Sequence, residues 1–279
     1  MKDRCYLFGG SFDPPHRGHQ ELIRGLLQRA TDDRISEIRI VPAAVSPFKQ
    51  EGSHAGDEHR LAMLELMLNE LSVSVNLVSH TSTDSGEVHL PGTVSHDVRA
   101  SHTARTSPAL DTSHTSDISH FRDGSRTASG AIPVYLDTFE MKQGGVSYTV
   151  LTVKYLQSLQ REPVLVIGAD NLYSLEKWKE HEYLLEEVPI LVFRREGQDA
   201  GIQESREKLM QKYSVRSLEI LDLCPPGCSS TSIRERLSAQ SLEVEPARNE
   251  AAELKKCIPE SVLQYIQNHG LYRGARAAN

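Results

Sequence analysis

The chain has 279 residues and a formal net charge of −7, with 38% hydrophobic and 25% charged residues. This length and composition are typical of a globular protein with a substantial core, and we expect one domain over residues 1–279. The acidic balance argues against a nucleic-acid binder, which usually carries an excess of basic residues. No apolar run has the length of a signal peptide or a membrane span, so we expect a cytoplasmic protein with no membrane partner. A homo-oligomer is left open.

The cysteines are scattered along the chain at Cys5, Cys224, Cys228 and Cys257. They are too few for a disulfide scaffold. No second pair of Cys or His residues stands at the spacing that would complete a zinc site with Cys224 and Cys228. We therefore predict reduced thiols, the default in the cytoplasm, and no metal held by protein side chains.

The first motif combines an apolar run, a glycine turn and a pair of histidines. The run 5–8 before Gly9 and Gly10 predicts a buried parallel strand that ends in a tight turn. The helical pattern begins near His16, and a helix that starts after such a turn favours anions through its free amides and its dipole. His16 and His19 share one helix face and could both donate to a bound phosphate. The alternative is that they only cap or decorate a surface helix.

The segment His16-Arg17-Gly18-His19 resembles the His-x-Gly-His signature of a nucleotidyltransferase superfamily, and Gly-Gly-Ser-Phe-Asp-Pro-Pro before it is similar to bacterial nicotinate-nucleotide adenylyltransferases. The resemblance implies a Rossmann-like α/β fold, with a doubly wound parallel sheet and helices on both faces. It implies catalytic roles for the two histidines. It also implies ATP contacts from Gly9, Gly10, Ser11, Phe12, His16 and His19. The motif alone leaves cytidylyltransferases and pantetheine-phosphate adenylyltransferases open.

A strand–helix–strand unit follows, because an apolar stripe at helical spacing leads to a second strand that ends at Pro42. The loop 43–49 then lies where open α/β sheets bind ligands. Lys49 is its only cation. By resemblance Lys49 is catalytic and contacts nucleotide phosphate, although Phe48 stands where the family has a histidine. The alternative is a solvated surface lysine.

A helix over 57–69, for which Asp57 is a candidate N-cap, and an alternating strand over 71–77 come next. From residue 79 to 130 the chain is crowded with Ser, Thr, His, Asp and Gly. Such a composition cannot bury enough apolar surface to offset the entropy of ordering, so we expect a mobile insertion. It contains six of the 12 histidines, but their spacings match no standard metal site.

The pattern resumes with a strand over 132–139 and a glycine-rich turn that leads into a helix. Ser147 or Thr149 could cap that helix. Glu140 followed by Gly-Val-Ser-Tyr-Thr resembles the nicotinate-nucleotide branch of the superfamily. In that branch, backbone amides around Ser147, Tyr148 and Thr149 receive the nicotinate carboxylate, which a helix start favours.

A central strand over 163–167 leads directly to Gly168 and Asp170. A carboxylate after a parallel strand can bind a ribose or a cation, although Asp170 could also be an N-cap. By resemblance Gly168 and Asp170 contact ATP, and the indole of Trp178 stacks on the nicotinate ring instead of filling the core. Arg194, after the next strand, matches an arginine of the family at the substrate.

A further strand over 218–223 precedes a second polar motif. Ser229, Ser230 and Thr231 come before a helix that carries Arg234, and hydroxyls, free amides and arginine together make a cradle for a polyphosphate. A capping box from Thr231 is the alternative. The run Ser-Ser-Thr-Ser-Ile-Arg resembles the second family signature, which grips the ATP phosphates and makes Arg234 catalytic.

Residues 238–256 are polar and predict a second, smaller insertion, and a last helix begins after Pro259 and ends near Gly270. The resemblance as a whole implies transfer of AMP from ATP, bound with magnesium, to nicotinate mononucleotide, giving nicotinate adenine dinucleotide and pyrophosphate. Two alternatives stay open. One is an adenylyltransferase for nicotinamide mononucleotide or another phosphate acceptor, and the other is a non-catalytic nucleotide-binding module.

Overall fold

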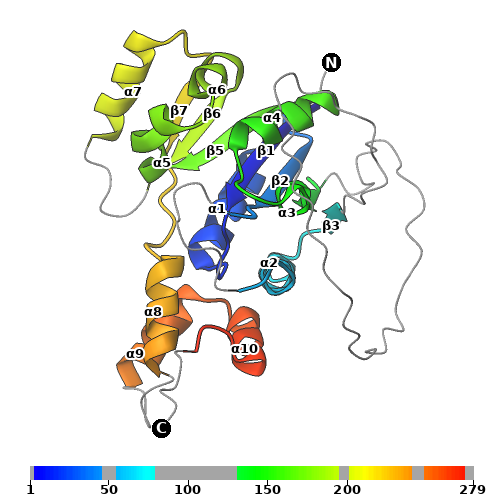
Figure 1. Cartoon of the computed structure of the whole chain (residues 1–279), viewed down its shortest axis with the longest axis vertical. Helices are drawn as coiled ribbons and strands as arrows, with labels where there is room; N and C mark the ends of the chain where they lie inside the picture. The colour runs from blue at the N-terminus through cyan, green and yellow to red at the C-terminus, as the bar shows by residue number, and fades with distance from the viewer. Residues whose placement is uncertain (1–2, 46–54, 79–130, 195–200, 241–247, 274–279) are drawn as a thin grey trace, which may run out of the picture. The chain divides into compact units, whose positions relative to one another are not determined.

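The computed structural model describes residues 3–45, 55–78, 131–194, 201–240 and 248–273 (Figure 1). These residues belong to one compact unit. Lys49 and the segment 79–130 lie outside the described residues. In the described part of the chain, no helix is long and apolar enough to cross a membrane.

One parallel sheet runs through the described residues. Its seven strands are β1 (Asp3–Gly10), β2 (Glu37–Pro42), β3 (Val75–Val78), β4 (Val134–Asp137), β5 (Arg161–Gly168), β6 (Ile190–Phe193) and β7 (Leu218–Leu221). They are ordered β3-β4-β2-β1-β5-β6-β7, and all neighbouring strands pair in parallel. This order confirms the predicted doubly wound sheet.

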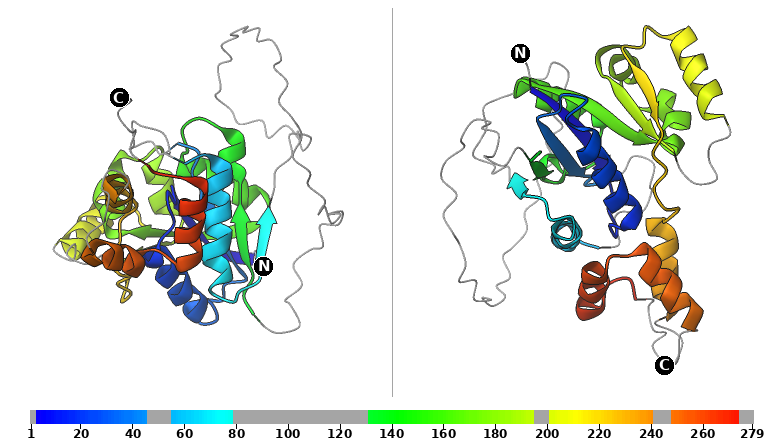
Figure 2. Two further views of the ribbon diagram at one scale, coloured as in Figure 1. Left: turned by 90° about the horizontal axis from the view of Figure 1, so that it is seen from below. Right: turned by 180° about the vertical axis from the view of Figure 1, so that it is seen from behind.

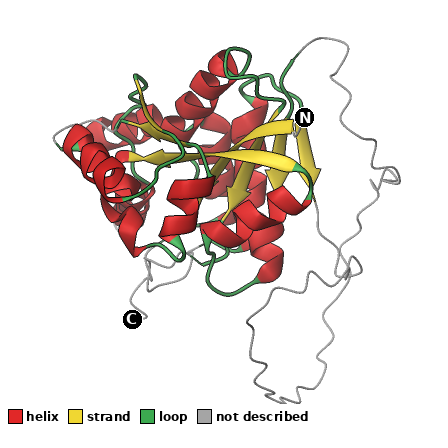
Figure 3. Cartoon of the chain, turned by 90° about the horizontal axis from the view of Figure 1, so that it is seen from above, coloured by secondary structure: helices red, strands yellow, loops and turns green. Residues whose placement is uncertain are grey.

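Helices cover both faces of the sheet, as Figure 3 shows. Those near the start and end of the chain are α1 (Arg17–Arg29), α2 (Asp57–Asn69), α8 (Ser230–Gln240), α9 (Arg248–Cys257) and α10 (Glu260–His269). Those of the middle are α3 (Phe139–Gln143), α4 (Thr149–Ser158), α5 (Ala169–Ser174), α6 (His181–Glu187) and α7 (Ile202–Lys212). Figure 2 shows α10 beside α2, so the end of the chain packs against its first half.

The core lies on both faces because consecutive side chains of a strand point to opposite sides. In β1, Tyr6 and Phe8 belong to one buried cluster, whereas Cys5 and Leu7 belong to the other. Helices α1, α2, α8, α9 and α10 supply apolar side chains to the first cluster, and α4 to α7 supply them to the second. The fully apolar run 5–8 is therefore explained by burial on both sides.

The position of β1 determines where ligands can bind. β1 pairs with β2 on one side and with β5 on the other, so the chain winds first in one direction from the centre and later in the opposite direction. In such sheets a crevice opens at the carboxyl ends of the strands that flank this switch. Gly10 ends β1 and Gly168 ends β5 at that edge.

Three predicted strands are shorter in the structure than their sequence pattern indicated. The strand expected over 218–223 ends at Leu221, the last residue of β7. The strand expected over 71–77 is confined to β3, because Leu71 and Ser72 form a turn that closes α2 and Ser72 has a φ of +55°. The strand expected over 132–139 is confined to β4, since the amide of Phe139 donates to Asp137 Oδ1 at 3.0 Å and starts α3. The predicted bounds of the helix 57–69 are confirmed, but its N-cap is Gly56 instead of Asp57.

The prediction of reduced thiols is wrong for two cysteines, because Cys228 and Cys257 form a disulfide. Their Cα atoms lie 5.5 Å apart although 29 positions separate them in sequence, since α9 folds back along α8. Cys5 is buried and Cys224 is exposed, and both are free thiols. The segment 248–257, part of the expected polar insertion, is helical, and its Leu254 is buried in the core.

Candidate functional site

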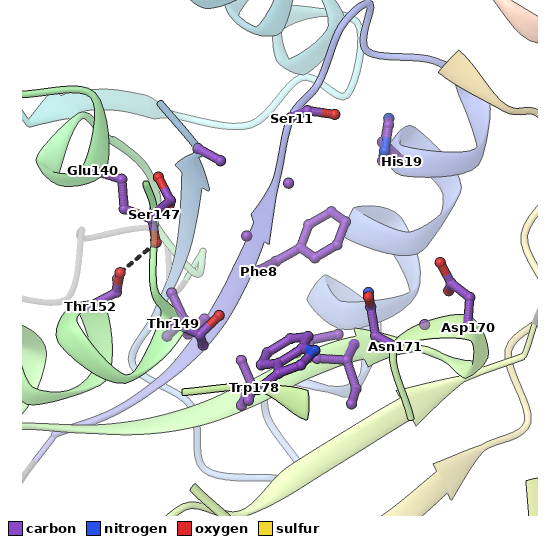
Figure 4. Close-up of a pocket in the computed structure, with 18 of the residues that line it drawn as sticks. Phe8, Ser11, His19, Glu140, Ser147, Thr149, Thr152, Asp170, Asn171 and Trp178 are labelled. Atoms are coloured by element: carbon purple, nitrogen blue, oxygen red, sulfur yellow. Dashed lines mark hydrogen bonds between the residues drawn. The ribbon is translucent and has the colours of Figure 1, made fainter. Parts of the chain in front are cut away.

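A cavity of about 530 Å³ opens at the carboxyl ends of β1 and β5. Figure 4 shows its two ends on opposite sides of the Phe8 ring. The end called here the histidine end is lined by Gly9, Gly10, Ser11, His16, His19, Ser229, Ser230 and Thr231. The end called here the glutamate end is lined by Glu140, Ser147, Tyr148, Thr149, Thr152 and Trp178.

His16 and His19 form a stacked pair at the start of α1. Their ring centroids are 3.7 Å apart with an angle of 20° between the planes, and the His16 side chain is buried. The backbone amide of His16 donates to Nδ1 of His19 at 3.2 Å. Because Nδ1 accepts this hydrogen bond, the proton of the neutral His19 ring is on Nε2, which is then its donor atom. His19 thus takes part in capping the helix and also lines the cavity.

Gly18, inside the histidine motif, is required by close packing. A Cβ atom on Gly18 would lie 3.0 Å from the His16 ring and 3.1 Å from the carbonyl oxygen of Pro226. Only glycine allows α1 to approach both the histidine ring and the loop before α8 without displacing them.

The second polar motif meets the first at the histidine end. Ser230 Oγ donates to the carbonyl oxygen of Pro14 at 2.9 Å across 216 positions. Arg234 Nη1 donates to the carbonyl oxygen of Asp13 at 2.6 Å across 221 positions. Two stretches from opposite parts of the chain therefore surround one cavity.

Thr231 is not the capping residue of α8, which was one alternative from the sequence. The helix begins at Ser230, so Ser230 and Thr231 are in its first turn. The amide of Ser232 donates to Ser229 Oγ at 3.4 Å, which makes Ser229 the capping side chain. The hydroxyl of Thr231 is exposed to the cavity side and accepts from Arg234 Nη2 at 3.4 Å.

Ser147 is fixed by the neighbouring loop instead of capping α4. Its Oγ accepts from the amide of Ala44 at 2.9 Å, and its own amide donates to the carbonyl oxygen of Val45 at 2.9 Å. The N-cap of α4 is Tyr148, and no side chain caps this helix. The amide of Leu151 donates to the carbonyl oxygen of Tyr148 at 2.9 Å, so the first-turn amides that α4 leaves without a carbonyl partner are those of Thr149 and Val150.

Glu140 is the carboxyl group of the glutamate end. Its side chain accepts a hydrogen bond from the hydroxyl group of Thr152. Burial raises the pKa of Glu140 above its ordinary value, the hydroxyl groups of Thr152 and Ser147 lower it in part, and the negative charge of Asp137 raises it again. A carboxyl group with a raised pKa at a cavity wall is typical of functional sites.

The remaining predicted site residues lie in several places. Gly168 and Asp170 line the cavity, and Gly168 is the N-cap of α5, so the alternative that Asp170 caps this helix is wrong. Phe12 is fully buried with its ring 4.9 Å from that of His19, behind the cavity wall. Arg234 does not line the cavity either, and its guanidinium contacts the carbonyl oxygen of Asp13. Arg194 is half-buried and does not line the cavity.

Several residues that the sequence analysis did not single out also line the cavity. They are Thr152, Asn171, Lys177 and Lys179. Thr152 follows Thr149 by three positions on α4, so helical spacing could have placed both on one face. Lys179 follows Trp178, and its Nζ lies 4.6 Å from the centre of the Tyr148 ring, which fits a cation–π contact. The sequence signal for Lys179 was a cation directly after an aromatic residue.

Among the described side chains, no group of three His, Cys, Asp or Glu residues could hold a metal ion. The carboxylate of Asp170 is exposed at the cavity. It fits a single oxygen ligand for a hard cation whose other ligands come from a bound phosphate or from water.

Comparisons with known proteins agree with this geometry. A family model described as cytidylyltransferase-like matches residues 7–106 and 133–236. A protein of Rhodopirellula baltica named "probable nicotinate-nucleotide adenylyltransferase" is 26% identical over 272 residues, covering 96% of this chain and 92% of that protein. A protein of the same name from Leptospira borgpetersenii strain JB197 is 25% identical over 269 residues, covering 95% of each.

Among solved structures, the chain is similar to Plasmodium falciparum nicotinic acid mononucleotide adenylyltransferase complexed with NaAD. The TM-score is 0.58 at 17% identity, and the match covers 97% of each chain. At this identity the similarity shows a shared fold.

Proposed function

The chain belongs to the cytidylyltransferase-like family, and from this membership we propose that it transfers the adenylyl group of ATP to nicotinate mononucleotide in NAD biosynthesis. The products are nicotinate adenine dinucleotide and pyrophosphate. The observation that carries the proposal is the meeting of the two polar motifs, across 216 positions, at one cavity. Relatives that carry the nicotinate-nucleotide name match nearly the whole chain, which supports the choice of acceptor.

The reaction proceeds by direct attack. A phosphate oxygen of the mononucleotide forms a bond to the α-phosphorus of ATP, the bond from that phosphorus to the bridging oxygen breaks, and pyrophosphate leaves with the electron pair. The attacking oxygen is already ionised, so no protein nucleophile is needed. Catalysis is therefore positioning and stabilisation of charge in the transition state.

The histidine end holds the triphosphate. Nε2 of His19 donates to a phosphate oxygen, His16 supports the same group, and the first-turn amides and hydroxyls of α8 hold the others. Asp170 would be the protein ligand of a magnesium ion bound with ATP, and that ion would supply positive charge to the phosphates. In this proposal Lys49, in the loop after β2, offsets negative charge on the phosphates. Arg234, which does not line the cavity, also contributes positive charge.

The glutamate end holds the acceptor. The nicotinate carboxylate is received at the start of α4, where unbonded amides and the helix dipole favour an anion. The indole of Trp178 stacks on the pyridine ring, and Arg194 contributes charge near the substrate. The cytoplasm, where ATP is available, is the proposed compartment.

The test is an assay of pyrophosphate release with ATP, magnesium and nicotinate mononucleotide. Replacing His19 removes one donor to the transition state, so we expect His19→Ala to lose about 100- to 1000-fold in turnover while its circular dichroism is unchanged. His181→Ala, a histidine outside the cavity lining, is the matched control and should keep its activity. Turnover of His19→Ala close to that of the wild type would contradict the assignment.

The same assay separates the alternatives. Nicotinamide mononucleotide lacks the carboxylate that the start of α4 would receive, so it should be the poorer acceptor. ATP binding by the wild type without pyrophosphate release from any mononucleotide would instead indicate a non-catalytic module.

A further inference from the structure

Glu140 places a carboxyl group in the wall of a cavity whose proposed ligand is itself a carboxylate. We propose that Glu140 is a positioning residue. It spans the turn 144–148 by accepting the hydroxyl hydrogen of Thr152, and it thereby holds the start of α4 and sets the preference for an acceptor that carries a carboxylate. The inference rests on the proposed function and concerns specificity instead of the adenylyl transfer itself.

The direction of the hydrogen bonds around Ser147 is determined by chemistry. The amide of Ala44 can only donate, so Ser147 Oγ is the acceptor of that bond. Glu140 on α3 accepts the hydroxyl hydrogen of Thr152 on α4. The loop after β2 therefore holds Ser147 at the end of the turn, and Glu140 connects α3 with the first turns of α4.

The turn that Glu140 holds has little support from the core. Gly144 and Gly145 both have positive φ, of +66° and +65°, and with Val146 they are exposed. Val146 forms a single bridge to Val45. Because side-chain packing does not determine the turn, the hydrogen bonds at its two ends do, and Glu140 accepts two of them, from the amide of Gly144 and from the hydroxyl group of Thr152.

Glu140 differs from the buried carboxylates of the sheet. Glu37 and Asp137 both pair with the buried guanidinium of Arg39, at 2.7 and 2.8 Å. Among the described residues Glu140 makes no ion pair, and the donor to its side chain is the neutral hydroxyl group of Thr152. The position of the Glu140 side chain therefore depends on this hydrogen bond.

The arrangement favours a carboxylate at the start of α4. The hydroxyl hydrogen of Thr152 is directed at Glu140, which leaves the amides of Thr149 and Val150 to the ligand. A ligand carboxylate makes stronger, charge-assisted hydrogen bonds to those amides than a ligand amide does.

The test compares the acid and amide mononucleotides in wild type, Glu140→Ala, Glu140→Gln and Thr152→Val. We expect Glu140→Ala to raise the KM for nicotinate mononucleotide about 10- to 100-fold, as for the loss of hydrogen bonds to a charged group. The KM for ATP and the turnover number at saturation should stay close to those of the wild type. The ratio of kcat/KM for acid over amide should fall, and titration calorimetry with nicotinate mononucleotide should show the same loss of affinity.

Glu140→Gln keeps one acceptor oxygen at the same place and should restore most of the ratio, and Thr152→Val should lower it less than Glu140→Ala does. Glu207→Ala, an exposed glutamate on α7, is the matched control. An unchanged acid-to-amide ratio in folded Glu140→Ala would overturn the inference, and so would an equal loss for ATP and both mononucleotides. If Glu140→Ala does not fold, the ratios of Glu140→Gln and Thr152→Val decide. Failure of the wild type to use nicotinate mononucleotide would instead overturn the proposed function.

Discussion

The two ends of the cavity are held together by different kinds of contact. At the histidine end, Ser230 and Arg234 donate to backbone carbonyl oxygens of residues 216 and 221 positions away. At the glutamate end, Thr152 donates to the carboxyl group of Glu140 only 12 positions away. The contacts of Ser230 and Arg234 should therefore depend on the long-range docking of helices, and the contact of Thr152 on local structure and on the protonation of Glu140.

The docking at the histidine end depends on the end of the chain. Asp13 is buried, and its carboxylate accepts from the hydroxyl of Tyr272 at 2.6 Å and from the amide of Ala55 at 3.3 Å. Arg60, fully buried, donates to the carbonyl oxygens of Ser11 and Ala43. Residues from α2, α8 and the segment after α10 thus converge on the loop that carries the histidine motif.

The largest expected effect is on the histidine end, when the contact of Arg234 is removed. Arg234→Met removes a charged donor from the carbonyl oxygen of Asp13, and we expect kcat/KM for ATP to fall about 10- to 100-fold. The acid-to-amide ratio should not change, because the glutamate end is held separately. Arg236→Met, an exposed arginine on the same helix, is the control. A change in the ratio would show that the two ends are coupled.

A smaller effect is expected from Tyr272→Phe, which leaves the buried carboxylate of Asp13 without its shortest hydrogen bond. We expect the free energy of unfolding to fall by about 1–3 kcal/mol, measured by urea denaturation. Tyr173→Phe, on a ring that is 44% exposed, should change it by less than about 0.5 kcal/mol. Equal stability of Tyr272→Phe and wild type would mean that the end of the chain does not support the histidine motif.

The smallest effect is the pH dependence of the glutamate end. The pKa of Glu140 is raised in the folded protein, so between the unfolded value of roughly 4.3 and the folded value the folded state binds more protons. The stability contributed by this group is then present at low pH and is lost as pH rises through the folded pKa. Glu140→Gln does not titrate, so its free energy of unfolding relative to the wild type should increase as pH rises above about 4. A difference that stays constant with pH would contradict the raised pKa.

The sequence was most informative where the pattern is local. Both bounds of α2 follow from apolar residues at helical spacing, and the run 5–8 marks the central strand because it is apolar on both faces. The alternating pattern of 71–77 was misleading. Leu71 belongs to the closing turn of α2, Val73 follows that turn, and both pack on the core, so tertiary packing outweighed strand periodicity.

The contacts of the site were less accessible to sequence reasoning. Arg234 was recognised as a cation for phosphate, but its partner is the backbone carbonyl of Asp13, and every residue has such a group. Glu140 was recognised only as part of a motif, because a carboxyl group has a raised pKa only when the surrounding protein buries it. The pairing of Cys228 with Cys257 was missed since it depends on α9 folding back along α8.

By itself the sequence determined the chemistry of the two polar motifs, the order of the strands along the chain and the family to which they belong. These depend on side-chain type and on spacing within a few turns of chain. Only the tertiary structure decided that His19 and Ser230 line one cavity and that Glu140 accepts a hydrogen bond from Thr152 beside it. The reason is physical: local periodicity selects each element, whereas the meeting of distant elements is selected by burial of both faces of the sheet at once.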